Sequence, residues 1–280
     1  MEYPRFEGDR VILAALAEDV GLGDITTLST VPEEERSVAH LVAKEDLLLA
    51  GLPAFFRVFE LLDPDDPVIW ECSFKDGDKV NAGDAIAVGR GSSRTLLTGE
   101  RTALNILQRL SGIATMTAEW SAELAGTNTR LIDTRKTTPG LRALEKYAVR
   151  VGGGANHRIG LFDGVLIKEN HIRAAGSIDK AVVSAKKRAP HTLKVEVEVT
   201  NLDELKSAIE AGADAVLLDN MDNPTLAEAV KLAAGRIILE ASGNMSKERL
   251  SSVAKTGVDL ISAGALTHSA PSVDLSLLFK

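Results

Sequence analysis

Along the first ninety residues, the spacing of apolar positions changes several times. In residues 8–20 apolar side chains recur every three or four positions, which predicts an amphipathic helix. The turn and N-cap residues of Gly23–Thr27 end that pattern, and residues 53–62 return to helical spacing. The other segments predict strands at residues 37–43, 46–50, 68–73 and 85–90. The first part of the chain is therefore expected to form an α+β layer.

The pattern changes near Thr98. Residues 99–124 form one long helical pattern, with Leu104, Leu107, Leu110 and Ile113 on one face. Short apolar runs then alternate with helical segments. The runs are 130–133, 164–167, 193–199, 215–218, 237–239 and 260–262, and the helical segments are 140–150, 177–188, 202–211, 224–234 and 246–256.

This alternation predicts right-handed βα units and a parallel sheet. Six strands at short intervals favour an α/β barrel, either complete or incomplete. The sequence contains neither a Rossmann fingerprint nor a P-loop motif.

Composition narrows the class of protein. The 280 residues include 45% hydrophobic and 26% charged residues, and the net charge is −8. A single cysteine, Cys72, excludes an internal disulfide and a thiolate metal cluster. The first ten residues show no secretory signal, and no apolar run is long enough to span a bilayer. We expect a cytoplasmic globular protein that binds neither nucleic acid nor membranes.

Positive charge is concentrated in one stretch of the chain. Residues 130–173 contain nine Lys or Arg residues and four acidic residues, a net charge of +5, so the rest of the chain sums to −13. A basic stretch in an acidic protein favours a site for a small polyanion over a general nucleic-acid surface.

Polar side chains follow each of the six predicted strands, at the edge where barrel enzymes hold their active sites. This coincidence is the strongest sign of an enzyme in the residues themselves. The groups are Asp133–Lys136, Lys168–Asn170, Glu196 with Glu198, Asp219–Asn220, Glu240–Asn244 and Ser262–Ala265.

The last two of these groups contain glycine turns, Ser242–Gly243–Asn244 and Ala263–Gly264–Ala265. Either turn alone is equally well explained as an ordinary strand-to-helix connection. Two consecutive turns after the final strands favour phosphate binding by backbone N–H groups.

Glu196 and Glu198 are two positions apart on a strand, so their side chains face the same side. Glu198 and Asp219 either hold a hydrated Mg²⁺ or pair with Lys168 or Lys136 in a structural network. A role in the chemistry is less expected for Glu196, which lies deeper in its strand.

Three arginines, Arg101, Arg135 and Arg158, are candidates to bind a carboxylate or a phosphate with two hydrogen bonds each. Lys168 is either a Schiff-base lysine or a fixed positive charge for the substrate. His157 and His171 lack the spacing of a zinc site. Arg142, Lys146 and Arg150 lie on a helix and are interpreted as a solvated face.

Several long motifs strongly resemble those of the quinolinate phosphoribosyltransferase family, the decarboxylating nicotinate-nucleotide pyrophosphorylases of NAD biosynthesis. The resemblance covers nearly the whole chain. Its most specific parts are TRKTTPGLR and GGGANHR, within Thr134–Ile172, and it continues through EVEVTNLDEL, VLLDNM, LEASGN and ISAGALTHSAPSVDLSL.

The resemblance implies an incomplete seven-stranded α/β barrel with an N-terminal open α/β sandwich domain. It places the sandwich at residues 1–103, joined by the tail 266–280, and the barrel at residues 104–265. The seventh strand would lie in a segment that the pattern assigns to a helix. The resemblance also implies a homo-oligomer, expected to be a dimer, in which Arg101 reaches the neighbouring subunit's site.

The implied activity is that of a type II phosphoribosyltransferase. It converts quinolinate and phosphoribosyl pyrophosphate (PRPP) to nicotinate mononucleotide, pyrophosphate and CO₂ in de novo NAD biosynthesis. Mg²⁺ would accompany the PRPP diphosphate, held by Glu198 and Asp219, and no organic cofactor is implied. The expected catalytic residues are Lys136, Lys168, Glu198 and Asp219. The expected substrate-binding residues are these four together with Arg101, Thr134, Arg135, His157, Arg158, Ser242, Gly243, Asn244, Ala263, Gly264 and Ala265.

Three other functions remain alternatives at this point. They are a related phosphoribosyltransferase-like protein with another substrate, a Schiff-base aldolase that uses Lys168, and a polyanion-binding module without enzymatic activity. The intact cationic motifs disfavour the first, the acidic residues near Lys168 disfavour the second, and the acidic remainder of the chain disfavours the third.

Overall fold

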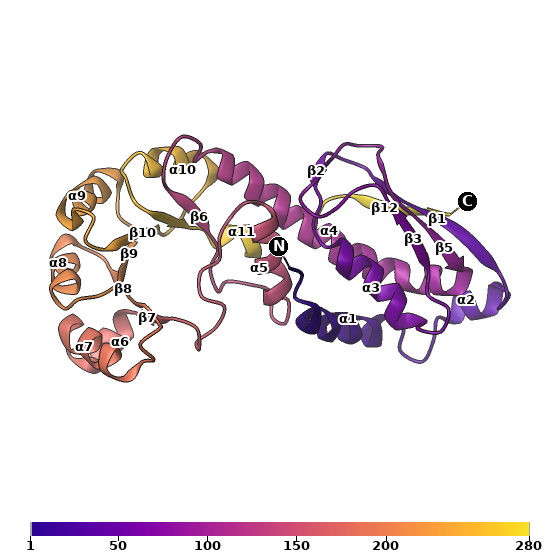
Figure 1. The fold of residues 1–280 in the computed structure, drawn as a ribbon, viewed down its shortest axis with the longest axis horizontal. Coiled ribbons are helices and arrows are strands. Elements are labelled where there is room, and N and C mark those ends of the chain that lie inside the picture. The colour runs from indigo at the N-terminus through magenta and orange to yellow at the C-terminus, as the bar shows by residue number, and fades with distance from the viewer. Residues whose placement is uncertain (1, 280) are drawn as a thin grey trace. The chain divides into compact units, whose positions relative to one another are not determined.

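A computed structural model describes residues 2–279, which fold into two compact units (Figure 1). Unit 1 comprises Met1–Ala118, Thr138–Gly153 and Ser269–Lys280, and unit 2 comprises Glu119–Thr137 and Gly154–His268. The domain boundary predicted after residue 103 lies inside a helix, α4 (Ser93–Ala122), and stays a prediction. No helix within residues 2–279 has the length and hydropathy of a membrane span.

Unit 1 is built on a four-stranded antiparallel sheet with the order β12-β1-β5-β3. Alternate side chains of β1 are buried, because one face of the strand packs on the core. The strands are β1 (Arg36–Ala43), β3 (Ile69–Cys72), β5 (Ala85–Ser92) and β12 (Leu275–Phe279), with β2 (Leu47–Leu48) and β4 (Lys79–Val80) as a separate pair.

The helices of unit 1 bury the apolar stripes seen in the sequence. The core contains Phe55 and Phe59, whose rings contact Trp70 at centroid distances of 5.1 Å each. Asp24 caps the second helix by accepting a hydrogen bond from the backbone N–H of Thr27 at 3.0 Å. The helices are α1 (Arg5–Asp19), α2 (Ile25–Thr30), α3 (Leu52–Leu62), most of α4, and α5 (Arg142–Val151).

One helix differs from its prediction. The segment 140–150 is helical, but as α5 it belongs to unit 1, although it lies in sequence between two strands of unit 2. The interpretation of Lys146 as part of a solvated face is wrong, because its side chain is 1% exposed. The neighbouring Glu145 is also buried, and it accepts hydrogen bonds from Arg109 and Thr138. The polar residues of α5 therefore help to fix the helix within unit 1.

Unit 2 is the predicted α/β unit with a parallel sheet, in the order β6-β11-β10-β9-β8-β7. All its strand pairs are parallel, and in Figure 1 the strands form an arc with α6–α10 on its outer side. The strands are β6 (Arg130–Ile132), β7 (Val165–Ile167), β8 (Val195–Val199), β9 (Ala215–Asp219), β10 (Ile238–Ser242) and β11 (Leu260–Ser262). The helices are α6 (Glu169–Ala175), α7 (Ile178–Arg188), α8 (Leu202–Glu210), α9 (Asn223–Ala233), α10 (Lys247–Ala254) and α11 (Ala265–His268).

The described part of unit 2 contains six strands, and the place of a seventh is taken by a single parallel bridge between Ile132 and Ala155. Ala155 does not lie in a predicted helix, but in the segment that follows α5. The sheet is open between Ala155 and β7, since no ladder joins them. The α/β class is thus confirmed, as a parallel sheet that does not close.

Candidate functional site

A cavity of about 610 Å³ lies in unit 2, at the carboxyl ends of the parallel strands. Parallel α/β sheets hold their ligands at this edge, and the volume suits two small substrates. Every predicted site residue except Arg101 lines the cavity; Arg101 is an exposed residue of α4 in unit 1. The predicted residues found there are Thr134, Arg135, Lys136, His157, Arg158, Lys168, Glu198, Asp219, Ser242, Gly243, Asn244, Ala263, Gly264 and Ala265.

Four cationic side chains line this cavity: Arg135, Lys136, Arg158 and Lys168. The Arg158 guanidinium donates one hydrogen bond to the carbonyl of Gly164 at 2.9 Å, and its Nε is buried without a partner. Burial and the positive charge of Arg135 lower the pKa of Arg158. Arg135 and Arg158 repel each other, and an anion that binds to both guanidinium groups offsets this repulsion.

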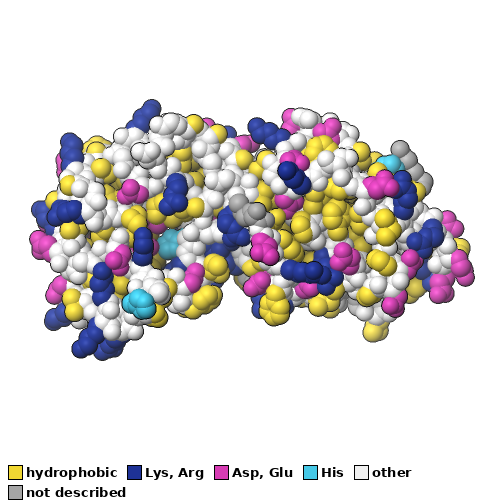
Figure 2. Space-filling view, viewed as in Figure 1, with side chains coloured by type: hydrophobic (Ala, Val, Ile, Leu, Met, Phe, Trp, Pro, Cys, Tyr) yellow, Lys and Arg dark blue, Asp and Glu magenta, His cyan; other side chains and the backbone are white. Residues whose placement is uncertain are grey.

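The basic stretch 130–173 is divided between the two units. Arg142, Lys146 and Arg150 lie in α5 and belong to unit 1, whereas the four cations of the cavity belong to unit 2. On the face of unit 2 shown in Figure 2, in the left half of the view, Lys and Arg side chains gather around a His side chain. The positive charge at the cavity therefore comes from the ends of β6 and β7 and from the segment after Ala155.

Buried hydrogen bonds hold the cationic segments in place. Asp133 is 0% exposed at the end of β6, and its carboxylate accepts hydrogen bonds from the His157 N–H at 2.8 Å and the Asn156 amide at 2.7 Å. The Thr267 hydroxyl donates to the Lys136 carbonyl at 2.8 Å. Asp133, a polar strand-end residue in the sequence, thus anchors a neighbouring segment and does not line the cavity.

The acidic residues of the cavity come from neighbouring strands. Glu198, Leu217 and Glu240 are in register across β8, β9 and β10. Glu198 forms an ion pair with Lys168, as one of the two sequence-based alternatives predicts. Asp219, at the end of β9, accepts a hydrogen bond from the Asn220 amide at 2.9 Å. Their carboxylate oxygens are of the ligand class that Mg²⁺ prefers, and both carboxylates line the same cavity.

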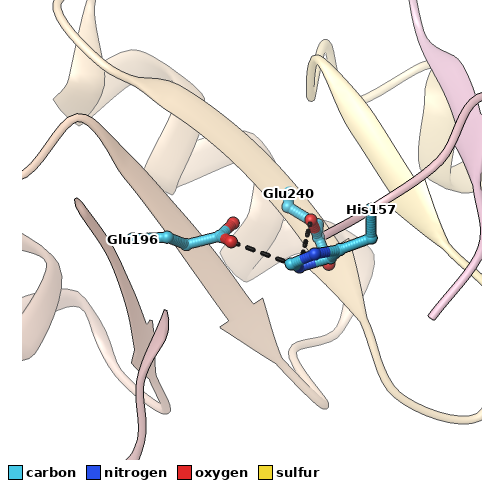
Figure 3. Close-up of side chains that lie close together, drawn as sticks. All are labelled: His157, Glu196 and Glu240. Atoms are coloured by element: carbon cyan, nitrogen blue, oxygen red, sulfur yellow. Dashed lines mark ion pairs between the residues drawn. The ribbon is translucent and has the colours of Figure 1, made fainter. Parts of the chain in front are cut away.

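Three titratable groups meet deeper in the same sheet. The Nε2 atom of His157 lies 3.2 Å from a carboxylate oxygen of Glu196 and 3.7 Å from one of Glu240 (Figure 3). Glu240 is 1% exposed, and its second oxygen has no hydrogen-bond partner. Burial, reinforced by the charge of Glu196, raises the pKa of Glu240 to about 7.

The hydrogen bonds of His157 indicate whether this cluster is a metal site or a group of residues linked by hydrogen bonds. The ligand atoms of His157, Glu196 and Glu240 lie within 4.8 Å of one another, close enough for a metal ion. The Arg158 N–H, however, donates to His157 Nδ1 at 2.6 Å, so Nδ1 carries no proton. A neutral imidazole then carries its proton on Nε2 and donates it toward the carboxylates. This tautomer favours a hydrogen-bonded His–carboxylate cluster over a metal site.

The raised pKa of Glu240 makes stability depend on pH. Its folded-state value of about 7 exceeds the ordinary value of 4.5, so the folded chain holds this proton more tightly than the unfolded chain. Stability from this group is full below pH 4.5 and is lost as pH rises through about 7. Glu240→Gln should remove this dependence, so that the variant gains on the wild type by about 2 kcal/mol between pH 5 and pH 8.

Urea unfolding at several pH values measures this difference. Glu169→Gln is the matched control, because Glu169 is a largely exposed carboxylate on α6 in the same unit. Unfolding free energies of wild type and Glu240→Gln that run parallel over this range would show that Glu240 ionises normally.

The two predicted glycine turns both line the cavity. Gly243 and Asn244 have positive φ angles of 99° and 46°. A Cβ atom on Gly264 would lie 3.0 Å from the Lys136 side chain and 3.1 Å from that of His268. The backbone of the second turn therefore approaches its neighbours closely, as glycine allows.

Several lining residues were not among the predicted site residues: Leu166, Leu217, Asn220, Glu240, Met245, Ser262 and His268. Asn220, Glu240 and Ser262 stand within the polar strand-end groups, so that signal included them without assigning a role. His268 lies three positions after the glycine turn Ala263–Gly264–Ala265. It reaches the cavity because the residues between form the short helix α11.

Two family models match the chain. The model of the quinolinate phosphoribosyl transferase N-terminal domain matches residues 24–111, and the model of its C-terminal domain matches residues 113–278. Together they cover most of the chain, including every residue that lines the cavity.

Individual relatives agree with the family models. A protein of Synechocystis sp. named "Probable nicotinate-nucleotide pyrophosphorylase (carboxylating)" is 48% identical over 265 residues, which cover 94% of this chain and 89% of the relative. A protein of the same name from Bacillus subtilis is 46% identical, with 93% and 89% covered. The crystal structure of NadC from Streptococcus pyogenes has a TM-score of 0.95 and 44% identity, and the match covers 100% of this chain and 99% of that one.

Proposed function

Because this chain belongs to the quinolinate phosphoribosyl transferase family, we propose that it transfers the phosphoribosyl group of PRPP to quinolinate. The products are nicotinate mononucleotide, pyrophosphate and CO₂, and the reaction supplies NAD biosynthesis. The observation that carries this proposal is the cavity itself, in which four cationic side chains and two glycine turns accompany the carboxylates of Glu198 and Asp219.

The charges of the cavity match those of the two substrates. Quinolinate brings two adjacent carboxylates, which Arg135 and Arg158 bind through paired N–H groups. Lys136 and Lys168 hold carboxylate or diphosphate oxygens, and the turns at Gly243 and Gly264 bind phosphate through backbone N–H groups. Repulsion between the two arginines falls when the dicarboxylate binds, which favours quinolinate over a monocarboxylate.

Glu198 and Asp219 are also the residues that would hold Mg²⁺ together with the diphosphate of PRPP. Small hard cations take one or two protein carboxylates and complete their coordination with water and substrate oxygens. When bound, the ion neutralises charge that develops on the departing pyrophosphate. The reaction requires no organic cofactor.

In the first step the C1–O bond of the ribose breaks and pyrophosphate leaves. C1 then has oxocarbenium character, and the carboxylates of Glu198 and Asp219 stabilise this positive charge. The pyridine nitrogen of quinolinate attacks C1 and forms the N–C1 bond. Arg135 and Arg158 hold the ring so that its nitrogen faces C1, and this positioning supplies much of the rate enhancement.

In the second step the ring is a pyridinium and accepts electrons. The bond between C2 and its carboxylate breaks, the electron pair stays on C2, and CO₂ leaves. C2 then takes up a proton. The chain's contribution is a fixed arrangement of charges that keeps the remaining carboxylate and the phosphates in place.

Lys168 is assigned a fixed charge in this reaction. A Schiff-base mechanism needs a lysine amine that is free to attack the substrate, whereas the Lys168 Nζ is engaged in an ion pair with Glu198. This disfavours the aldolase alternative.

We further propose a homo-oligomer, with a dimer as the simplest form, in which Arg101 of one subunit completes the site of its neighbour. A cytoplasmic location belongs to the same proposal.

A product assay tests the proposal directly. Purified protein is given PRPP and Mg²⁺ with either quinolinate or nicotinate, and nicotinate mononucleotide and CO₂ are measured. We expect product from quinolinate alone. Product from nicotinate alone would contradict the dicarboxylate assignment, and no product from either would favour a related protein with another substrate.

A further inference from the structure

Two loops that line the cavity are joined by an arginine outside it. Arg249, on the first turn of α10, donates hydrogen bonds to the carbonyl of Gly243 at 3.0 Å and to the carbonyl of Met221 at 2.9 Å. Gly243 lies in the loop after β10, and Met221 lies in the loop after β9. Arg249 does not line the cavity, so it does not itself contact a ligand there.

The backbone of these loops has an unusual conformation. Asn220, Gly243 and Asn244 all have positive φ angles, of 54°, 99° and 46°. Residues other than glycine adopt such angles rarely, and they keep them only when the surrounding structure holds them in place. The loops therefore need contacts that fix them.

Side-chain and backbone hydrogen bonds also connect the two loops directly. The Asn220 N–H donates to the Ser242 carbonyl at 2.9 Å, and the Asn244 amide donates to the Asn220 side-chain oxygen at 3.3 Å. That same oxygen would lie 2.2 Å from a Cβ atom on Gly243, so glycine is required for the two loops to approach this closely. These hydrogen bonds thus link the two loops to each other.

The linked loops carry groups that face the cavity. The Asn220 amide donates to the Asp219 carboxylate, so the conformation of Asn220 sets the direction of that carboxylate. Arg249 fixes the peptide plane between Gly243 and Asn244 through the Gly243 carbonyl. Because a trans peptide is planar, the Asn244 N–H then points away from Arg249.

We propose that Arg249 is a positioning residue for the phosphate-bearing substrate: it locks the two loops so that Asp219 and the backbone of Ser242–Asn244 keep the geometry that binds PRPP. The inference rests on the proposed function. An arginine that only stabilises the end of a helix would affect both substrates alike. A positioning role of Arg249 predicts weaker binding of PRPP and little change in the binding of quinolinate.

The chain offers a matched control. Arg236, three residues after the end of α9 in the same unit, also donates to two backbone carbonyls, those of Ala233 at 3.1 Å and Leu232 at 2.7 Å. Both carbonyls belong to that helix, and Arg236 does not line the cavity. Arg236→Met therefore removes the same kind of contact without releasing either loop.

The experiment compares Arg249→Met, Arg249→Lys and Arg236→Met with the wild type. Steady-state kinetics give kcat and the KM of each substrate, and calorimetry gives the Kd of PRPP in the presence of Mg²⁺. We expect Arg249→Met to raise the KM and the Kd of PRPP about tenfold or more, because small displacements of binding groups are costly. The KM of quinolinate should stay within about twofold, Arg249→Lys should give a smaller defect, and Arg236→Met should match the wild type.

Other results would overturn the inference. They are an unchanged PRPP affinity in Arg249→Met, an equal rise in both KM values, or the same PRPP defect in Arg236→Met. If circular dichroism shows that Arg249→Met does not fold, Arg249→Lys tests the inference by the same criteria. If the wild type shows no turnover with quinolinate, the proposed function fails, whereas the calorimetric comparison with PRPP still decides the role of Arg249.

Discussion

Replacing Arg135 by alanine is expected to lower kcat/KM for quinolinate about 100- to 1000-fold, the usual effect of removing one fixed donor from a site of developing charge. Arg135 lines the cavity, and its charge acts on the neighbouring Arg158. Arg135→Lys should recover only part of the activity, because an ammonium group cannot make the paired contact to a carboxylate.

Arg173→Ala is the control for this series. Arg173 lies on α6, pairs with Glu169 at 2.7 Å, and has a side chain that is 75% exposed. Its replacement should leave the kinetics close to those of the wild type, and thermal unfolding should show that all three variants are folded. Near-normal kinetics in Arg135→Ala would remove Arg135 from the substrate site.

Disrupting the Lys168–Glu198 pair should abolish most activity with little loss of stability. The two side chains are 48% and 19% exposed, so the pair contributes at most about 1 kcal/mol to the free energy of unfolding. Lys168→Met and Glu198→Gln should each lower kcat about 100-fold or more, because each removes a charge assigned to the reacting groups. The double variant should be scarcely worse than the poorer single variant, since the two residues act as a unit.

A second ion pair in unit 2 serves as the control. Lys186 and Asp214 lie 3.0 Å apart with similar exposure, and neither lines the cavity. Lys186→Met should change kcat less than about twofold. Losses that multiply in the double variant would show that Lys168 and Glu198 act independently, and a kcat close to the wild-type value would place the pair outside the reaction.

Local periodicity predicted most of the elements because their apolar faces are buried locally. The six strands of unit 2 and the helices between them lie within a few residues of their predicted positions. The prediction missed α6, which buries none of its residues and so leaves no apolar stripe in the sequence. It also missed β12, whose partner β1 lies more than 200 residues away.

Site residues at the ends of strands could be predicted from the sequence. Those that depend on contacts between distant segments could not. The polar groups after the strands included most of the lining residues, but not His157 and Arg158. The state of Glu240 was not accessible from the sequence, since it depends on burial and on Glu196 and His157 from other segments. The assignment of α5 to unit 1 was missed for the same reason, because the partners of Glu145 and Tyr147 lie far away along the chain.

The pairing of β12 with β1 has a consequence for synthesis of the protein. Residues 39–43 of β1 find their partners in residues 275–279, and the segment 138–153 of unit 1 follows the first strand of unit 2. On the ribosome, which adds about 5–20 residues per second, the sheet of unit 1 stays incomplete until residues 275–279 leave the exit tunnel. Unit 2, whose last residue is His268, can complete its sheet first. We therefore expect the order of folding during translation to reverse the order of the units along the chain, with the early segments exposed to chaperones in the meantime.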